Sequence, residues 1–173
     1  NEAVCEESLF KIIHSKTRNM VRKGFKSNFK ILVNNSEESF NALFEIHQEN
    51  ILSVNGKPKK KKIFKNIREV FEPEKDYNIF TAEHNNKIVS SMLIFYHKNI
   101  IEYFCPATKS GYRDKNPLSA LIFTAMKHSI LNKNSLYWNW GGTWVSQKGV
   151  YFFKKRWGTT DYPYKYYIKT FSN

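Results

Sequence analysis

The sequence predicts an α/β fold of the α+β type, in which helices flank a mixed, mostly antiparallel central sheet behind an extra N-terminal helix. Apolar residues recur at helical spacing before residue 72 and at strand-like spacing from Tyr77 to Cys105, so a helical part precedes a sheet. The expected elements are a helix, a strand, two helices, three strands, a helix, a strand, a helix and a strand. A length of 173 residues favours one domain with a core of its own.

The first part of the chain is mostly helical in pattern. Two glutamates precede an apolar stripe and basic residues gather before Gly24, so one amphipathic helix is expected to end at that glycine. Residues 29–33 form a short β-rich run. Ser36 is expected to cap a second helix, and a third helix ends before Pro73.

The middle of the chain predicts an antiparallel meander. Its strands are expected at residues 77–84, 88–96 and 100–105, separated by short polar turns. Pro106 is expected to end the last of these strands, because proline has no N–H to continue a ladder.

The C-terminal part continues with alternating helices and strands. Asn116 followed by Pro117 indicates a capped helix start. A strand is expected at residues 136–140, a helix at 147–157 and a closing strand at 162–168.

The composition excludes several classes of protein. No run approaches the roughly 20 apolar residues that cross a bilayer, and no secretion signal is present, so we expect a cytoplasmic chain without a membrane span. Cys5 and Cys105 lie far apart in the sequence, without a C-x-x-C spacing or a nearby histidine pair. We therefore expect neither a disulfide framework nor a metal site.

The chain is strongly basic, with 28 Lys and Arg against 15 Asp and Glu and a formal charge of +13. A lysine-rich surface that keeps the protein in solution and a surface for a polyanionic partner both fit this balance. The densest run is residues 57–62, interrupted by Pro58. A solvated loop or helix start is the simplest interpretation of this run, and phosphate contact is the second.

Three short motifs stand close together in the last third of the chain. They are Asn-Trp-Gly-Gly at residues 139–142, Lys-Gly-Val-Tyr at 148–151 and Phe-Lys-Lys-Arg-Trp-Gly at 153–158. This series resembles the signature of FemAB-like transferases and their relatives in polysaccharide biosynthesis. The element order over residues 29–168 looks like the GNAT acyltransferase fold, to which those proteins belong.

The resemblance also suggests a domain organisation. Residues 18–23 are similar to the stretch that leads into the second GNAT domain of FemAB-like proteins. We expect residues 1–27 to form an N-terminal helix that links to an upstream GNAT domain, and residues 28–173 to form the GNAT-like acyltransferase domain. A complete single-domain relative with an added helix is the alternative.

The resemblance implies an enzyme that moves an acyl or aminoacyl group onto an amine or hydroxyl of a cell-envelope or polysaccharide precursor. The donor is acyl-CoA or aminoacyl-tRNA, so tRNA is a conceivable partner. Residues 108–117 depart from ordinary GNAT domains, because the spaced glycines that cradle the CoA pyrophosphate are absent. This departure argues against acetyl-CoA as the donor more strongly than it argues against the GNAT fold.

The same resemblance names site residues. It places Lys154 at the reacting centre, where its charge stabilises the tetrahedral intermediate. Charge pattern alone favours a solvated lysine at a helix end. The site is expected where the fourth and fifth strands separate, with substrate contacts at Tyr103, Asn139, Gly141, Gly142, Tyr151 and Phe153. Donor phosphates are expected at the helix start, beside Arg113, Lys115 and Asn116.

Two other functions remain open at this stage. A basic nucleic-acid-binding module is one, because basic and aromatic residues together hold single strands and 16% of the chain is aromatic. A non-catalytic half that completes a partner domain is the other. The sequence does not choose the donor, the acceptor, an amide or ester product, the general base or the oligomeric state.

Overall fold

The computed structural model describes residues 2–165 and 167–170. Along this part of the chain the elements are α1 (Glu2–Ile12), α2 (Ser15–Lys26), β1 (Lys30–Val33), α3 (Glu37–Leu52), α4 (Lys61–Val70), β2 (Tyr77–His84), β3 (Lys87–His97), β4 (Ile100–Thr108), the 3-10 helix η1 (Ser110–Lys115), α5 (Pro117–Lys133), β5 (Tyr137–Asn139) and α6 (Lys148–Lys155).

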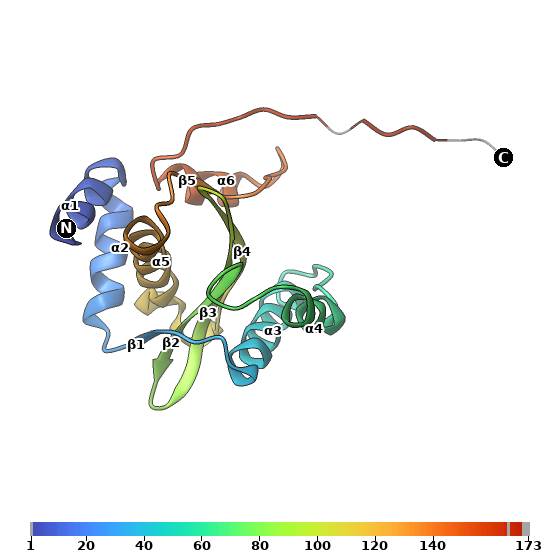
Figure 1. The fold of residues 1–173 in the computed structure, drawn as a ribbon, viewed down its shortest axis with the longest axis horizontal. Helices are drawn as coiled ribbons and strands as arrows, with labels where there is room; N and C mark the ends of the chain where they lie inside the picture. The colour runs from blue at the N-terminus through green and yellow to red at the C-terminus, as the bar shows by residue number, and fades with distance from the viewer. Residues whose placement is uncertain (1, 166, 171–173) are drawn as a thin grey trace.

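The strands form a single sheet in the order β1-β2-β3-β4-β5. The pairs from β1 to β4 are antiparallel, and β5 pairs with β4 in parallel. Helices α1, α2 and α5 cover one face of the sheet, and α3 and α4 cover the other (Figure 1). The expected meander and the expected parallel neighbours β4 and β5 are therefore confirmed.

The core lies on both faces of the sheet. On the α5 side, Phe80, Ile94 and Ile101 are buried against residues of α5. On the other side, Leu43 of α3 packs with Ile79 and further residues of β3 and β4. Among the described residues, no helix has the length and apolar content that a membrane crossing requires.

The N-terminal region differs from the single helix that we expected. Two helices are present, and the chain turns between Ile13 and His14. The Arg18 guanidinium explains the break, because its Nη1 donates to the carbonyls of Phe10 (3.0 Å) and Ile13 (2.9 Å) at the end of α1. Gly24 does not end the helix, since α2 continues to Lys26.

The strand β4 also differs from the prediction, because Pro106 does not end it. Ser91 pairs with Ala107 and Leu93 with Phe104, so Cys105 and Pro106 together face the single residue between them on β3. This is a β-bulge, and Cys105 takes a positive φ of 47° within it. A proline is compatible with a bulge, where its missing N–H costs no ladder hydrogen bond.

The closing strand that we expected at residues 162–168 is not formed in the described residues 162–165 and 167–168. Residue 166 lies outside the described residues. Tyr162 and Ile168 are 83% and 87% exposed, and the segment runs away from the body in Figure 1. The spacing of its apolar residues resembles a strand, but Pro163 has no N–H to donate to a ladder.

We predict that Gly24→Ala lowers the free energy of unfolding, although alanine is the better helix former. An added Cβ would lie 2.6 Å from the Asn116 carbonyl oxygen and 2.9 Å from the Ala120 Cβ, so α2 and α5 would have to move apart. Such overpacking costs about 1–3 kcal/mol. Denaturant unfolding followed by circular dichroism measures the change.

Gly149→Ala is the matched control, because Gly149 also lies in a helix but an added Cβ meets nothing within 4 Å. It should stabilise the protein by up to about 1 kcal/mol. Equal effects of the two substitutions would contradict the close packing of α2 on α5.

Candidate active site

The candidate site lies where β5 separates from β4. The parallel pairing covers only Ile100–Glu102 of β4, and its last register pair is Glu102 with Asn139. Beyond this pair β4 continues through the bulge. The segment that follows β5 turns away from β4 at Gly141, which has a φ of +67°. Within the described residues, β4 therefore has an open edge from Tyr103 onward.

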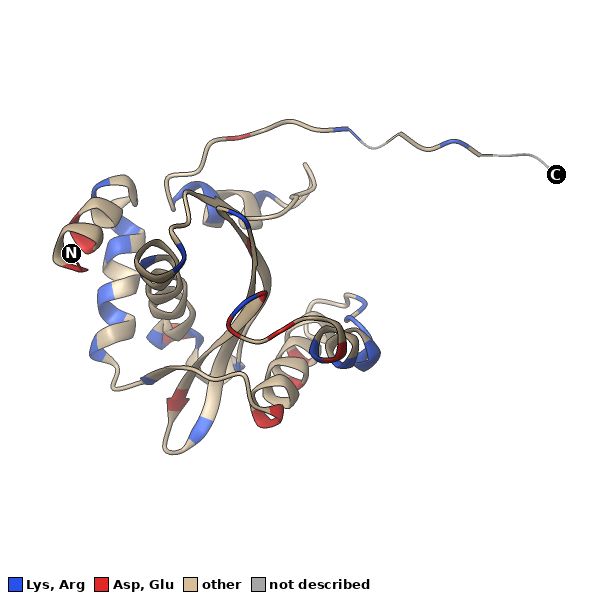
Figure 2. Cartoon of the chain, viewed as in Figure 1, with Lys and Arg blue, Asp and Glu red and all other residues tan. Residues whose placement is uncertain are grey.

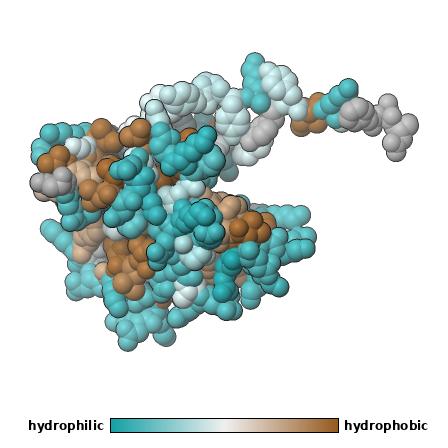
Figure 3. Space-filling view, in the orientation of Figure 1, coloured by the Kyte–Doolittle hydropathy of each residue, from teal (hydrophilic) through white to brown (hydrophobic). Residues whose placement is uncertain are grey.

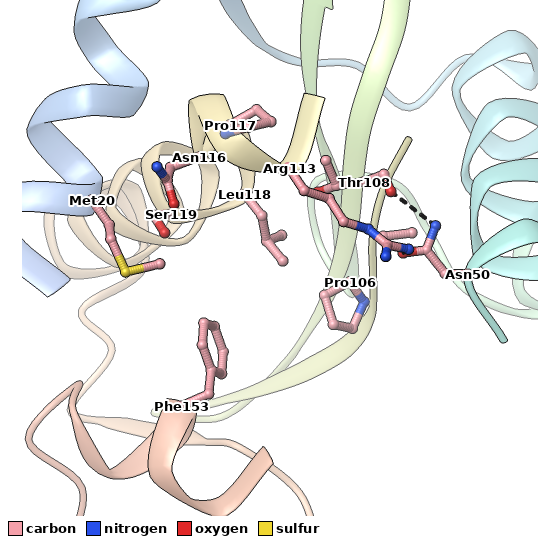
Figure 4. A pocket seen from close by; sticks show the side chains of 11 residues that line it. Met20, Asn50, Pro106, Thr108, Arg113, Asn116, Pro117, Leu118, Ser119 and Phe153 are labelled. Carbon is pink, nitrogen blue, oxygen red and sulfur yellow. Dashed lines mark hydrogen bonds between the residues drawn. The ribbon is translucent and has the colours of Figure 1, made fainter. Parts of the chain in front are cut away.

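A pocket of about 190 Å³ lies along this open edge (Figure 4). Pro106 of the bulge, the start of α5 and Phe153 of α6 form its walls. Met20 of α2 and Asn50 of α3 close two further sides. Residues of α2, α3 and α6 thus meet the continuous segment from β4 to α5 where the fold separates two parallel strands.

Arg113 supplies the positive charge of the pocket. Its Nη2 donates to Asn50 Oδ1 at 3.0 Å, and the Asn50 amide in turn donates to the Thr108 carbonyl at 2.9 Å (Figure 4). The guanidinium is therefore held in place by α3 and β4 while its other N–H groups stay available. Of the predicted donor-binding residues, Arg113 and Asn116 line the pocket, and Lys115 is outside its lining.

Lys115 is engaged elsewhere, because its Nζ lies 5.5 Å from the centre of the Tyr112 ring. Asn116 has a left-handed backbone with φ 56° and its side chain donates to the Asp114 carbonyl at 2.9 Å. Its side chain therefore does not cap α5 as expected. Its position before Pro117 still marks the start of that helix.

The first turn of α5 offers few free amides to an anion. Pro117 has no N–H, and the amides of Ser119 and Ala120 both donate to the Asn116 carbonyl. In the described chain this leaves the Leu118 amide without a backbone partner. The turn is therefore a weaker phosphate cradle than a glycine-rich loop, as the departure in the sequence indicated.

Lys154 lies at the separation of the strands. Its Nζ donates to the carbonyls of Gly141 (3.0 Å) and Gly142 (3.1 Å) and to Thr143 Oγ1 (2.8 Å). Burial lowers the pKa of this amine, and the nearby Glu102 carboxylate opposes that shift. The half-buried ammonium thus joins α6 to the loop after β5.

The neighbouring Lys155 points to a different part of the structure. Its Nζ donates to the Thr159 carbonyl at 3.1 Å and to Asp161 Oδ2 at 3.2 Å. Tyr151 is exposed and its hydroxyl donates to the same Asp161 oxygen at 2.9 Å. Tyr151, which we expected at the substrate, therefore lies with Lys155 beside the C-terminal segment.

Glu102 and Asn139 fix the opposite side of the same loop. The Asn139 side-chain oxygen accepts the Gly141 amide at 2.9 Å, which closes the turn after β5. Burial raises the pKa of Glu102, while Lys154 and a hydrogen bond from Asn139 lower it. Gly142 lies against the Tyr164 hydroxyl, so a side chain there would collide with it.

Aromatic side chains pack against one another beside the site. Tyr103 is buried, its ring centre lies 5.0 Å from that of Trp140, and its hydroxyl has no partner in the described chain. Phe153 lines the pocket and meets Trp140 edge-on at 6.1 Å. Of these two predicted substrate residues, Phe153 therefore reaches the pocket and Tyr103 lies in the core beneath it.

Several site residues were missed from the sequence. Asn50 and Met20 carry no local signal, since they reach the pocket only through the packing of α3 and α2. Thr143 follows the double glycine and was passed over. Glu102 pairs with Asn139 at the end of the parallel ladder, a position that the sequence alone does not reveal. The described residues contain no group of histidine, cysteine and acidic side chains that could hold a metal ion.

Comparisons of sequence and of structure give different results. No family model matches the sequence, and no curated protein matches it. The structure is similar to that of FemX, with a TM-score of 0.79 and 14% identity over 90% of this chain. This chain spans 56% of the FemX chain.

Smaller acetyltransferases match over nearly their whole length. An aminoglycoside acetyltransferase from an uncultured soil metagenomic sample, in complex with sisomicin, has a TM-score of 0.62 and 14% identity over 86% of this chain and 99% of its own. A Trypanosoma brucei acetyltransferase has a TM-score of 0.58 and 14% identity over 83% of this chain and 100% of its own. The chain has the GNAT-type acyltransferase fold that FemX and these acetyltransferases share.

Proposed function

We propose that the chain is an acyltransferase that moves an acyl or aminoacyl group onto an amine or hydroxyl of a cell-envelope or polysaccharide precursor. The observation that carries the proposal is the pocket at the open edge of β4, with Phe153 of α6 in its wall. The next residue of α6 is the half-buried Lys154, which contacts the loop after β5 and does not itself line the pocket. FemX and acetyltransferases share this fold, and one of the latter was solved with an amine-bearing aminoglycoside, sisomicin.

The donor is expected to lie along the open edge of β4, with a phosphate near Arg113 and the Leu118 amide. Both acyl-CoA and aminoacyl-tRNA offer a reactive ester or thioester next to phosphate groups. The sparse amides of the α5 start favour a donor that needs only one phosphate contact there. A transfer assay with each donor in turn distinguishes these two candidates.

The chemistry needs a nucleophile to attack the carbonyl carbon, which forms a tetrahedral intermediate with a negative oxygen. Collapse of the intermediate breaks the bond to the donor's sulfur or oxygen, and this leaving group takes up the proton that the attacking group loses. Lys154 has three N–H donors, and all three are engaged in the structure. We assign the N–H on the Thr143 hydroxyl to the oxyanion, because a hydroxyl can rotate away and two carbonyls still hold the amine.

The first two helices would connect this domain to an upstream GNAT domain. Cys5, Leu9 and Val21 belong to the same buried cluster as residues of α5, so these helices pack onto the domain itself. We propose that residues 28–173 form the catalytic unit with this helical support.

Both cysteines are free and buried, which agrees with the reducing cytoplasm that we propose as the location.

We predict that Lys154→Ala lowers turnover by about a hundredfold or more, with a smaller effect on substrate affinity. The charge is needed chiefly in the transition state, so kcat should fall while KM changes little. A transfer assay under saturating donor, with circular dichroism to confirm folding, measures both.

Lys155→Ala is the matched control, because its amine contacts Thr159 and Asp161 instead of the loop after β5. Thr143→Ala is the second control, since it frees one N–H of Lys154 while the charge and two carbonyl contacts remain. If Lys154→Ala proves as mild as Lys155→Ala, the lysine is only a structural tie and the catalytic role is wrong.

We predict that the rate falls on the alkaline side at a lower pH than an ordinary lysine, with a pKa of about 10.4, would give. The sign follows from burial, which lowers the pKa of Lys154, so the charged amine is lost sooner as the pH rises. Glu102 raises that pKa, so Glu102→Gln should move the fall to still lower pH. The pH profile of kcat measures the shift.

Asp161→Asn removes a carboxylate beside Lys155 and should leave the profile in place. An alkaline limb that stays unmoved in Glu102→Gln would show that Lys154 does not carry the titrating charge.

A further inference from the structure

The connection between α3 and α4 carries a dense set of positive charges. We call residues 52–63 the lysine loop; it contains the exposed lysines Lys57, Lys59, Lys60, Lys61 and Lys62. Within the described part of the chain, no salt bridge involves any of these five amines. Figure 2 shows them gathered before α4 and along its first turn, on the α3 and α4 side of the sheet.

The same loop exposes apolar side chains on both sides of its lysines in the sequence. Leu52 is 54% exposed, Val54 70% and Ile63 41%. Figure 3 shows apolar surface bordered by hydrophilic surface over the α4 side of the molecule. Exposed apolar surface that is bordered by charged side chains is typical of an interaction surface.

The lysine loop is held in shape by the protein beneath it. The amides of Val54 and Gly56 donate to the Ile51 carbonyl, and the Lys59 amide donates to the buried His47 ring. The ammonium groups of two lysines lie over aromatic rings, since Lys59 Nζ is 5.4 Å from the centre of the Phe104 ring and Lys61 Nζ is 5.8 Å from that of Phe44. The lysines and the exposed apolar residues Leu52 and Val54 therefore lie on one segment whose backbone is fixed by the domain.

We propose that the lysine loop docks the protein onto an anionic bilayer surface. The lysines would contact the phosphate headgroups, and Val54 and Leu52 would enter the boundary between headgroups and acyl chains. The exposed Leu52 and Val54 favour a bilayer over a nucleic acid, because a phosphate backbone has no apolar region in which these side chains could be buried. The proposal does not depend on the transferase assignment, since docking is measured without turnover.

Docking would also orient the candidate site. Lys59 lies over Phe104 of β4, so the loop reaches the strand whose open edge borders the pocket. A bilayer bound at the loop would then lie on the α3 and α4 side of the sheet, close to that strand.

The test is co-sedimentation of the full chain with vesicles of phosphatidylcholine alone and of phosphatidylcholine and phosphatidylglycerol in equal parts. We expect binding to the anionic vesicles that weakens as salt rises. Each lysine near an anionic surface contributes about fivefold, so the triple substitution Lys57→Gln, Lys60→Gln and Lys62→Gln should weaken binding about a hundredfold. Leu52→Ser with Val54→Ser should remove the part of the binding that survives high salt.

The charge-matched control is Lys16→Gln, Lys23→Gln and Lys26→Gln, which removes the same charge from exposed positions of α2 on the other face of the sheet. It should bind anionic vesicles like the unmodified chain. Equal loss in both triple variants would show a general charge effect and overturn the proposal. So would an absence of vesicle binding, or displacement by a single-stranded RNA with no effect of the serine variant.

Discussion

The parallel pairing of β4 and β5 over only Ile100–Glu102 is the constraint on which the candidate site depends. If the pairing continued, β5 would fill the edge of β4 and no pocket would form beside the bulge. Two local features end it. The Asn139 side chain closes a turn onto the Gly141 amide, and the bulge at Cys105 shifts the direction of β4. The pocket is therefore a consequence of backbone geometry, and side chains only line it.

Lys154 places a half-buried positive charge where the two strands separate. Lys154 donates hydrogen bonds to two backbone carbonyls and a hydroxyl of the loop after β5. A neutral donor could make the same hydrogen bonds without the free-energy cost of burying a charge. The Glu102 carboxylate lowers that cost from the other side of the loop. An arrangement that keeps a charge in a half-buried position is typical of sites where charge develops during a reaction.

The sequence predicted the parts of the fold that local pattern controls. The meander, the Ser36 cap and the α5 start at Pro117 each follow from turn or cap chemistry within a few residues. The failures have physical causes that are not local. Arg18 reaches back to end α1, and a bulge accommodates Pro106 only because β3 pairs on its other side. The described residues 162–165 and 167–168 show that apolar spacing alone does not make a strand.

The candidate site was predictable in outline and not in detail. The motif around Lys154 contains both the double glycine and the helix that contacts it, because the two are close in sequence. The contact of Arg113 with Asn50 was not predictable, since 63 residues separate them. Lys115 looked equivalent to Arg113 from the sequence. Only the fold turns one toward the pocket and the other onto Tyr112.

Every step of the proposed transfer requires an acyl donor to bind along the open edge of β4. Amide chemical shifts of the isotope-labelled full chain, titrated with acyl-CoA and separately with an aminoacylated RNA minihelix, measure this binding. We expect one donor to shift the amides of residues 103–105, 107 and 108 and of Leu118 most strongly. Shifts that avoid these residues with both donors, or no shifts at all, would contradict it.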